Sequence, residues 1–399
     1  MNILRQQESV KVNQIVASYL RAYQTQFPDF IRLDEQMWDL FEQKSASPGI
    51  RSYIAYKLFT LSGGQEWERN IGPLLGMIEM SIISSYATNR VFDKKSGGRS
   101  ESEAIKSVIA SALAREGVFQ TLQNCYEQEI INRLCLWYEI SEIQRWFYLG
   151  QYINSFKNVL PQSIQEQIRV DSTSPGYSFV LKQVEKVEEL LCAKIPELSN
   201  KELNIFITNQ FLRLYLINSH FYEKFAALSV KFHRDISAEQ EALLNGFGAL
   251  FGVGTQIIND IIDFALPSMG LNCTAKFSAD FYSDVRNGVA TFPIFLGLYQ
   301  GGQAKGKVCL SETYFSVAAE LADNKKEDIL YYLIESKAIQ TSLQIAAICL
   351  SEAKYYLTKA QVVEPDSELL NIFEIYRESR FVVNMFKWYR IQRRKKRGE

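Results

Sequence analysis

The stretch that decides the fold is Gly252–Asp263, which reads GVGTQIINDIID. It spaces Gln256, Asn259, Asp260 and Asp263 three or four residues apart along one polar stripe, so a helix brings their side chains together. The remaining positions are apolar: Ile257, Ile258, Ile261 and Ile262. A helix with so much apolar surface is enclosed by protein, which predicts that the carboxylates point inward.

Two carboxylates inside an apolar interior cost several kcal/mol unless a cation or another partner compensates them. Mg²⁺ is a suitable cation because it prefers one or two carboxylates together with waters and substrate phosphates. We therefore predict a Mg²⁺ site with Asp260 and Asp263 as principal ligands. The alternative is a solvent-exposed acidic turn.

The composition narrows the class of protein. The chain has 399 residues, of which 47% are hydrophobic and 22% charged, as in a folded globular protein. The aromatic content of 13% predicts interior space lined by aromatic rings. Six dispersed cysteines without a CxxC pair indicate reduced thiols. With His220 and His233 as the only histidines, zinc chemistry and a Ser-His-Asp triad are not expected.

The distribution of charge singles out the C-terminal tail. Lys387–Glu399 carries seven Lys or Arg residues against one Glu, which leaves 37 basic and 44 acidic residues in the rest of the chain. This pattern predicts peripheral contact with an anionic membrane surface, and the alternative is a solvated helix end. An acidic body argues against nucleic acid as a partner. The absence of a long apolar run and of a signal-peptide core predicts a cytoplasmic protein.

Helical periodicity dominates the chain, strand-like alternation is nearly absent, and nine prolines punctuate it. The pattern predicts helices over Leu74–Val91, Ile105–Leu122, Ile130–Phe156, Tyr177–Leu191, Leu203–Ser229, Ala238–Phe264, Phe292–Leu298, Leu330–Leu357 and Leu369–Met385. We therefore expect one all-α domain over residues 1–399, built as a large helical bundle.

The spacing of several motifs resembles the isoprenyl diphosphate synthase superfamily, which includes class I terpene synthases. GVGTQIINDIIDF is similar to the second aspartate-rich segment, with Asn259 in place of its first Asp. The segment Asp284–Leu298 is similar to the D-x-x-x-G-K-x-T-x-P motif that follows it. Upstream, Glu79–Asp93 fits the first aspartate-rich helix, and Arg99 falls on the second Arg of the next motif. These motifs lie within residues 45–300 and imply a helical bundle with a central cavity.

Four cations of the family's diphosphate pockets are missing. Ile50 and Tyr53 replace the Lys and Arg of the GKxxRP motif, Asn218 replaces a Lys, and Val289 replaces another. Each of these cations would make a charge-assisted contact to phosphate. Elongation with isopentenyl diphosphate is therefore not expected.

The acidic positions that remain resemble the ionising half of the family's site. The resemblance implies a divergent class I terpene synthase, which ionises and cyclises or rearranges a linear prenyl diphosphate with Mg²⁺ and releases pyrophosphate. It assigns Asp260, Asp263 and Asp93 to catalysis and metal binding with Asn259, places Arg90, Arg99 and Arg286 on the diphosphate, and gives Gln256 and Asn89 supporting positions. Ser84 and Ser85 either leave room for a long prenyl tail or pack helices together.

The first acidic helix leaves two further functions open. Asn89 and Arg90 stand where the family has its leading Asp pair, and Arg90 either contacts pyrophosphate or pairs with a neighbouring acid. This erosion is also typical of a non-catalytic or regulatory subunit that forms a heteromer with a prenyl diphosphate synthase. The second alternative is a divergent prenyltransferase, for which a homodimer is an expected assembly.

Overall fold

The computed structural model describes residues 10–12, 14, 17–18, 50–92, 101–127, 135–155, 175–266, 281–300, 305–316, 321–363, 369 and 380–397. All regular elements within these ranges are helical, which confirms the all-α prediction. The first half of the bundle comprises α3 (Ile50–Leu61), α4 (Trp67–Asn70), α5 (Gly72–Phe92), α6 (Glu101–Glu127), α7 (Cys135–Ser155), α9 (Pro175–Leu181), α10 (Val184–Cys192), α11 (Asn200–Leu214), the π-helical turn η2 (Tyr215–Ser219) and α12 (His220–Lys231).

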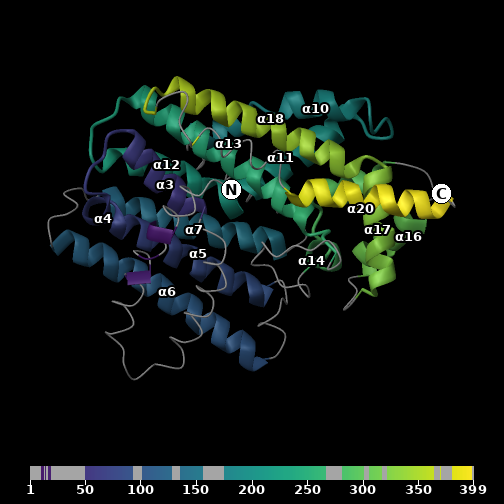
Figure 1. The fold of residues 1–399 in the computed structure, drawn as a ribbon, viewed down its shortest axis with the longest axis horizontal. Helices are drawn as coiled ribbons and strands as arrows, with labels where there is room; N and C mark the ends of the chain where they lie inside the picture. The colour runs from purple at the N-terminus through teal and green to yellow at the C-terminus, as the bar shows by residue number, and fades with distance from the viewer. Residues whose placement is uncertain are drawn as a thin grey trace.

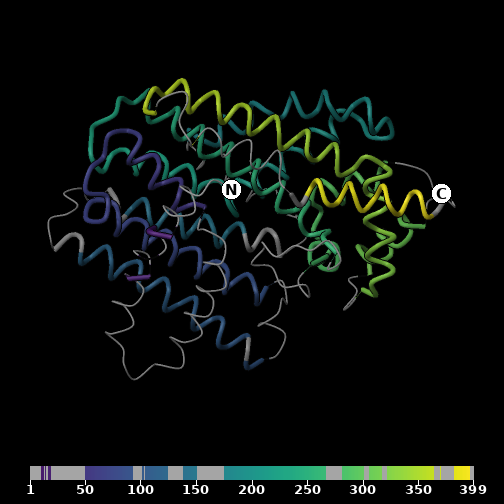
Figure 2. Tube along the Cα trace, viewed as in Figure 1, coloured from purple at the N-terminus to yellow at the C-terminus, as the bar shows by residue number. Residues whose placement is uncertain are grey.

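The second half comprises α13 (Ala238–Ile262), α14 (Ser283–Arg286), α15 (Phe292–Tyr299), α16 (Lys305–Ser316), α17 (Asp323–Glu335), α18 (Ala338–Lys359) and α20 (Arg380–Arg397). Helices α5 and α6 pack on each other at one end of the molecule, and α16, α17 and α20 lie at the other end (Figure 1). Helices α13 and α18 run side by side between these ends, as the tube view also shows (Figure 2).

Helix α13 carries the acidic stretch, and its sequence explains both its start and its close packing. Ser237 caps it by accepting from the Gln240 N–H at 3.1 Å, and the Gln240 side chain accepts from the Ser237 N–H at 3.1 Å. Gly248 and Gly252 face α12 and η2, where a Cβ would meet the Tyr222 carbonyl oxygen and the Ser219 Cα. The missing side chains therefore allow two helix backbones to approach closely.

Helices α11 and α12 are joined by a turn of π-helix at Tyr215–Ser219, and the three elements together form one rod. In this turn the His220 N–H reaches the carbonyl of Tyr215, five residues back. The predicted helix over Leu203–Ser229 lies within this rod. An inserted π-turn adds one residue to a helix and is common at functional sites.

Two predicted helices are wrong as single elements. The pattern over Leu330–Leu357 belongs to α17 and α18, which separate at Ser336 and Lys337. Lys337 adopts a left-handed backbone conformation with φ of 65°, although neither Gly nor Pro marks the break. In the same way, Tyr177–Leu191 divides between α9 and α10.

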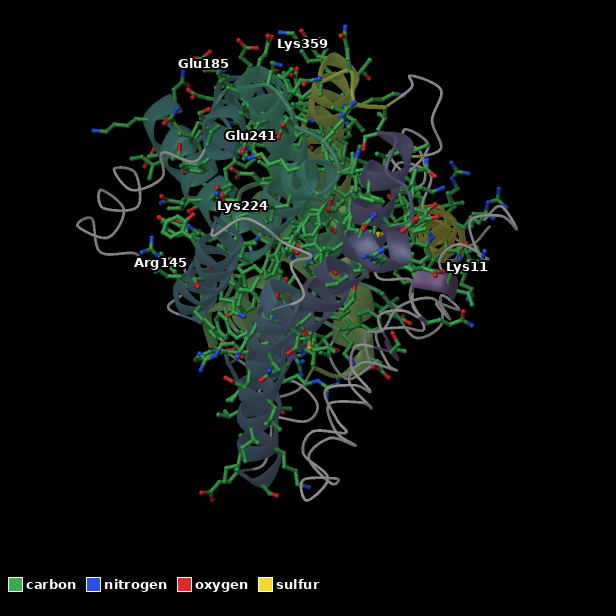
Figure 3. The ribbon with its side chains drawn as sticks, turned by 90° about the vertical axis from the view of Figure 1, so that its left-hand side faces the viewer. Lys11, Arg145, Glu185, Lys224, Glu241 and Lys359 are labelled. Carbon is green, nitrogen blue, oxygen red and sulfur yellow. The ribbon has the colours of Figure 1, made fainter. Side chains whose placement is uncertain are left out.

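Many charged side chains lie on the outer surface of the bundle. Lys11, Arg145, Glu185 and Lys359 are exposed and lie around the rim of the ribbon (Figure 3). Within the described ranges, no helix is both long and apolar enough to cross a membrane.

Candidate functional site

Asp260 is buried in the last turns of α13 and is held by an arginine from α11. The two side chains are each 2% exposed, and Arg213 Nη2 lies 2.5 Å from Asp260 Oδ2. Gln256 Nε2 donates to Asp260 Oδ1 at 2.9 Å, and Gln210 Oε1 accepts from Arg213 Nε at 3.2 Å. The carboxylate points inward as predicted, and the alternative of an exposed acidic turn is wrong. The cation that compensates it comes from the protein itself.

Asp263 is also fully buried, and it organises the start of α14. Its Oδ1 accepts from Ser283 Oγ at 3.2 Å, and its Oδ2 accepts from the Asp284 backbone N–H at 3.0 Å. Its own carbonyl accepts from the Tyr282 N–H at 2.8 Å. Tyr282 has a pKa raised well above its usual value, first by burial and then by the charge of Asp263. These contacts fix the segment that returns beside the end of α13.

Asn259, which stands at the first position of the acidic motif, departs from the expected arrangement. Asn259 is exposed, whereas Asp260 is buried, because consecutive residues of a helix point about 100° apart. The prediction that Asn259 shares the inward stripe is therefore wrong, and the stripe consists of Gln256, Asp260 and Asp263. Across the described ranges, no group of three or more His, Cys, Asp or Glu side chains is placed to hold a metal ion.

These contacts bear on the predicted Mg²⁺ site. Every carboxylate oxygen of Asp260 and Asp263 accepts a hydrogen bond from the protein, and Arg213 already supplies the compensating positive charge. As arranged, the described side chains do not fit a Mg²⁺ ion. Asp93, the acid expected from the first motif, and Arg99 lie outside the described residues.

The other motif positions lie at the end of α5 and in α14. Arg90 is buried, and its guanidinium carbon lies 4.9 Å from the centre of the Tyr86 ring. Asn89 is half-buried, and its Oδ1 accepts no hydrogen bond within the described structure. Arg286 is half-buried in α14. The diphosphate contacts assigned to Arg90 and Arg286 stay predictions.

The contacts of Ser84 favour a role in helix packing over a role in lining a cavity for a prenyl tail. Its hydroxyl lies 3.0 Å from that of Ser111 on α6 and 3.3 Å from that of Tyr148 on α7. Ser85 donates to the Ser81 carbonyl at 2.7 Å, within its own helix. Both hydroxyls are therefore engaged by the bundle.

The motif comparison overlooked Arg51, which stands between the two substituted positions Ile50 and Tyr53. Its Nη2 donates to Oδ1 of Asn218, the residue at another lost lysine position. Its guanidinium carbon lies 5.3 Å from the Tyr222 ring centre. No acidic residue of the described ranges pairs with Arg51, and its Nε is buried without a hydrogen-bond partner. The signal for this residue in the sequence is that a cation, Arg51, directly follows Ile50, which replaces the lysine of the motif.

A second hydrogen bond holds Asn218 in place, because its Nδ2 donates to the Gly252 carbonyl at 2.8 Å. The contact therefore links α3, η2 and α13. Beside it, Ser52 Oγ donates to the buried Glu79 Oε1 at 2.5 Å. Burial raises the pKa of the Tyr222 hydroxyl, so this phenol stays protonated beside the guanidinium.

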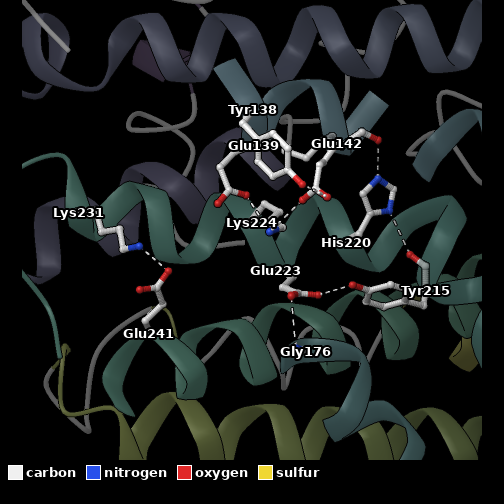
Figure 4. A network of polar contacts seen from close by, with 11 residues as sticks. Tyr138, Glu139, Glu142, Gly176, Tyr215, His220, Glu223, Lys224, Lys231 and Glu241 are labelled. Atoms are coloured by element: carbon white, nitrogen blue, oxygen red, sulfur yellow. Dashed lines mark hydrogen bonds and ion pairs between the residues drawn. The ribbon is translucent and has the colours of Figure 1, made fainter. Parts of the chain in front are cut away.

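A second polar network lies at the start of α12 (Figure 4). The fully buried Glu223 accepts from Tyr215 Oη at 2.7 Å and from the Gly176 N–H at 3.3 Å. The His220 ring lies between the carbonyls of Ile143, at 2.7 Å from Nε2, and Tyr215, at 3.2 Å from Nδ1. Burial lowers the pKa of His220 to about 4, so the ring is neutral near pH 7. This network joins α7, α9 and α12.

Solved structures share this arrangement of helices. A polyprenyl synthase from Caulobacter crescentus CB15, complexed with calcium and isoprenyl diphosphate, matches with a TM-score of 0.65 at 13% identity, covering 96% of this chain and 95% of that chain. The chain has the fold of the isoprenyl diphosphate synthases. The fold that the motif spacing predicts is thereby confirmed.

Two further structures support the same fold. A heptaprenyl diphosphate synthase from Staphylococcus aureus matches with a TM-score of 0.63 at 14% identity, covering 94% of this chain and 98% of that one. A geranylgeranyl pyrophosphate synthase from Corynebacterium glutamicum, complexed with isoprenyl diphosphate and magnesium, gives 0.62 at 12% identity, with 92% and 96% covered. At the level of sequence, no protein-family model and no curated protein matches the chain.

Proposed function

We propose that this chain binds a prenyl diphosphate and acts as a divergent prenyltransferase whose acceptor is not isopentenyl diphosphate. The observation that carries the proposal is Arg51, a cation without an acidic partner in the described structure, in contact with Asn218 where the fold's synthases place phosphate-binding lysines. The likeness to structures solved with isoprenyl diphosphate supports the same class of substrate.

The chemistry of Arg51 suits an anionic group. A guanidinium presents donors in a planar fork that matches phosphate oxygens, and such charge-assisted hydrogen bonds are about twice as strong as neutral ones. Its present partner, the Asn218 amide, is neutral and leaves the positive charge available. The adjoining rings of Phe221 and Tyr222, which are 3% and 5% exposed, make the surroundings of the guanidinium apolar.

The choice of acceptor follows from two of the other substituted motif positions. Tyr53 and Val289 are each 3% exposed, and neither is a cation, so these positions offer no charge to a second diphosphate. An acceptor that lacks a diphosphate is consistent with this loss. The alternative of intramolecular cyclisation, as predicted from the motif resemblance, needs the same first diphosphate but no acceptor.

The Mg²⁺ prediction enters no step of this proposal, because Asp260 and Asp263 are engaged by protein groups. The chain's own residues contribute a guanidinium for the diphosphate and buried aromatic rings around it that exclude water. The buried Arg213–Asp260 pair favours a second candidate, a non-catalytic subunit that binds a prenyl diphosphate or a synthase without turnover.

The test compares Arg51→Gln and Arg51→Lys with Arg145→Gln, an exposed control on α7. Calorimetry with farnesyl and geranylgeranyl diphosphates measures Kd, in the presence of Mg²⁺ and of a chelator. We expect Arg51→Gln to weaken binding roughly tenfold to a hundredfold, the value of a hydrogen bond to a charged group. Arg51→Lys should retain part of the affinity, and the control should bind as the parent chain does.

Turnover assays separate the candidates. Pyrophosphate release with transfer to an added aromatic or hydroxyl acceptor supports the transferase, whereas cyclic products support the predicted terpene synthase. Binding without release, together with altered product length of a co-purified synthase, supports the non-catalytic subunit. Incorporation of isopentenyl diphosphate by this chain alone, or equal affinities for all variants, contradicts the proposal.

A further inference from the structure

Helix α20 has an unusual charge composition. Arg380–Arg397 contains eight Lys or Arg residues and no Asp or Glu. The remaining chain holds 36 basic residues and all 45 acidic ones, so the positive charge of α20 contrasts with an acidic body. Figure 1 shows α20 in yellow at the end of the molecule beside α17.

The packing of α20 fixes which side faces the bundle. Val382 and Met385 are buried, and the Tyr389 ring lies 5.0 Å from the ring of Tyr331 on α17. Phe386 and Trp388 also pack against the hydrophobic core. The helix is therefore anchored along one face and cannot rotate freely about its axis.

The opposite face is both basic and partly apolar. Val383, Lys387, Arg390, Ile391 and Arg394 are exposed, and their spacing of four, seven, eight and eleven residues from the first places them on one side of the helix. Val383 is 45% exposed and Ile391 is 55% exposed. No described acidic residue pairs with the cations of this outer face.

We propose that this outer face of α20 docks on the surface of an anionic lipid bilayer. Cations near such a surface are attracted by its negative potential, and apolar side chains between them enter the headgroup region. The two aliphatic side chains favour a bilayer over nucleic acid, because they have no counterpart in a phosphate backbone. The acidic body is repelled by either polyanion and orients α20 toward the membrane.

The probe is the full chain with vesicles of phosphatidylcholine alone or with phosphatidylserine, followed by sedimentation. We expect binding to the anionic vesicles only, with an affinity that falls as salt screens the charges. A triple variant, Lys387→Gln with Arg390→Gln and Arg394→Gln, should bind roughly a hundredfold more weakly. A Val383→Ser, Ile391→Ser variant should also bind more weakly at unchanged charge.

The matched control removes the same charge elsewhere, from exposed positions of α6 and α7, by Lys106→Gln, Arg115→Gln and Arg145→Gln. This control should bind vesicles as the parent chain does, and circular dichroism should show equal helix content throughout. Equal binding by the α20 variants and the parent chain, or no binding at all, would overturn the proposal. If the α20 variants lose binding to a double-stranded oligonucleotide but bind vesicles as the parent chain does, the face would be assigned to nucleic acid. That result would also overturn the proposal.

Discussion

Replacing Arg213 by Met tests whether the protein's own cation compensates Asp260. The variant leaves a carboxylate that is 2% exposed with Gln256 as its one hydrogen-bond donor among the described residues, because the 2.5 Å contact to the guanidinium is lost. Removing one member of a buried ion pair costs about 3–5 kcal/mol, since an uncompensated charge stays in the interior. We expect the free energy of unfolding in urea, followed by circular dichroism, to fall by that amount.

The double variant Arg213→Met, Asp260→Leu distinguishes the charge from lost packing. Because both charges are gone, it should be more stable than Arg213→Met alone, with a coupling energy of about 2 kcal/mol or more. A half-buried surface pair provides the control: Lys231→Met breaks the contact with Glu241 and should cost about 1 kcal/mol or less. A loss below about 1 kcal/mol for Arg213→Met would refute the reasoning, because the pair would then not compensate a buried charge.

Two further changes probe the packing around α12. The pKa of His220 is about 4 in the folded chain, against an ordinary value of 6.5. Between these two pH values the unfolded chain therefore binds more protons than the folded chain. The free energy of unfolding should fall by about 3 kcal/mol as the pH drops from about 6.5 to about 4. His220→Gln should abolish this dependence in urea titrations at several pH values, and an unchanged slope would show that other groups cause it. Gly252→Val should lower the melting temperature because its side chain meets the Ser219 backbone, whereas Asn259→Ala on the exposed side should not; equal melting temperatures would contradict the close approach.

Local patterns predict part of this structure. The apolar periodicity around Asp260 correctly predicts a buried helix, and the spacing of four residues correctly brings Gln256 to its carboxylate. Periodicity does not show what faces the helix from elsewhere. Arg213 is 47 residues away from Asp260 in the chain, so the ion pair depends on how α11 and α13 pack. The break at Lys337 also lacks a local signal, because a positive φ is unusual for a residue other than Gly and neither Gly nor Pro stands there.

The π-helical turn at Tyr215–Ser219 determines how a one-residue change in the length of the α11–α12 rod would affect its packing. The turn takes up one extra residue, so deleting one residue there would restore a regular α-helix and leave the later residues facing as they do now relative to Asn200–Leu214. Arg213 would therefore keep its contact with Asp260, and His220 and Glu223 would keep their partners on α7 and α9. A relative whose rod is one residue shorter is therefore expected to pack in the same way, and an alignment with it should place the one-residue gap within Tyr215–Ser219.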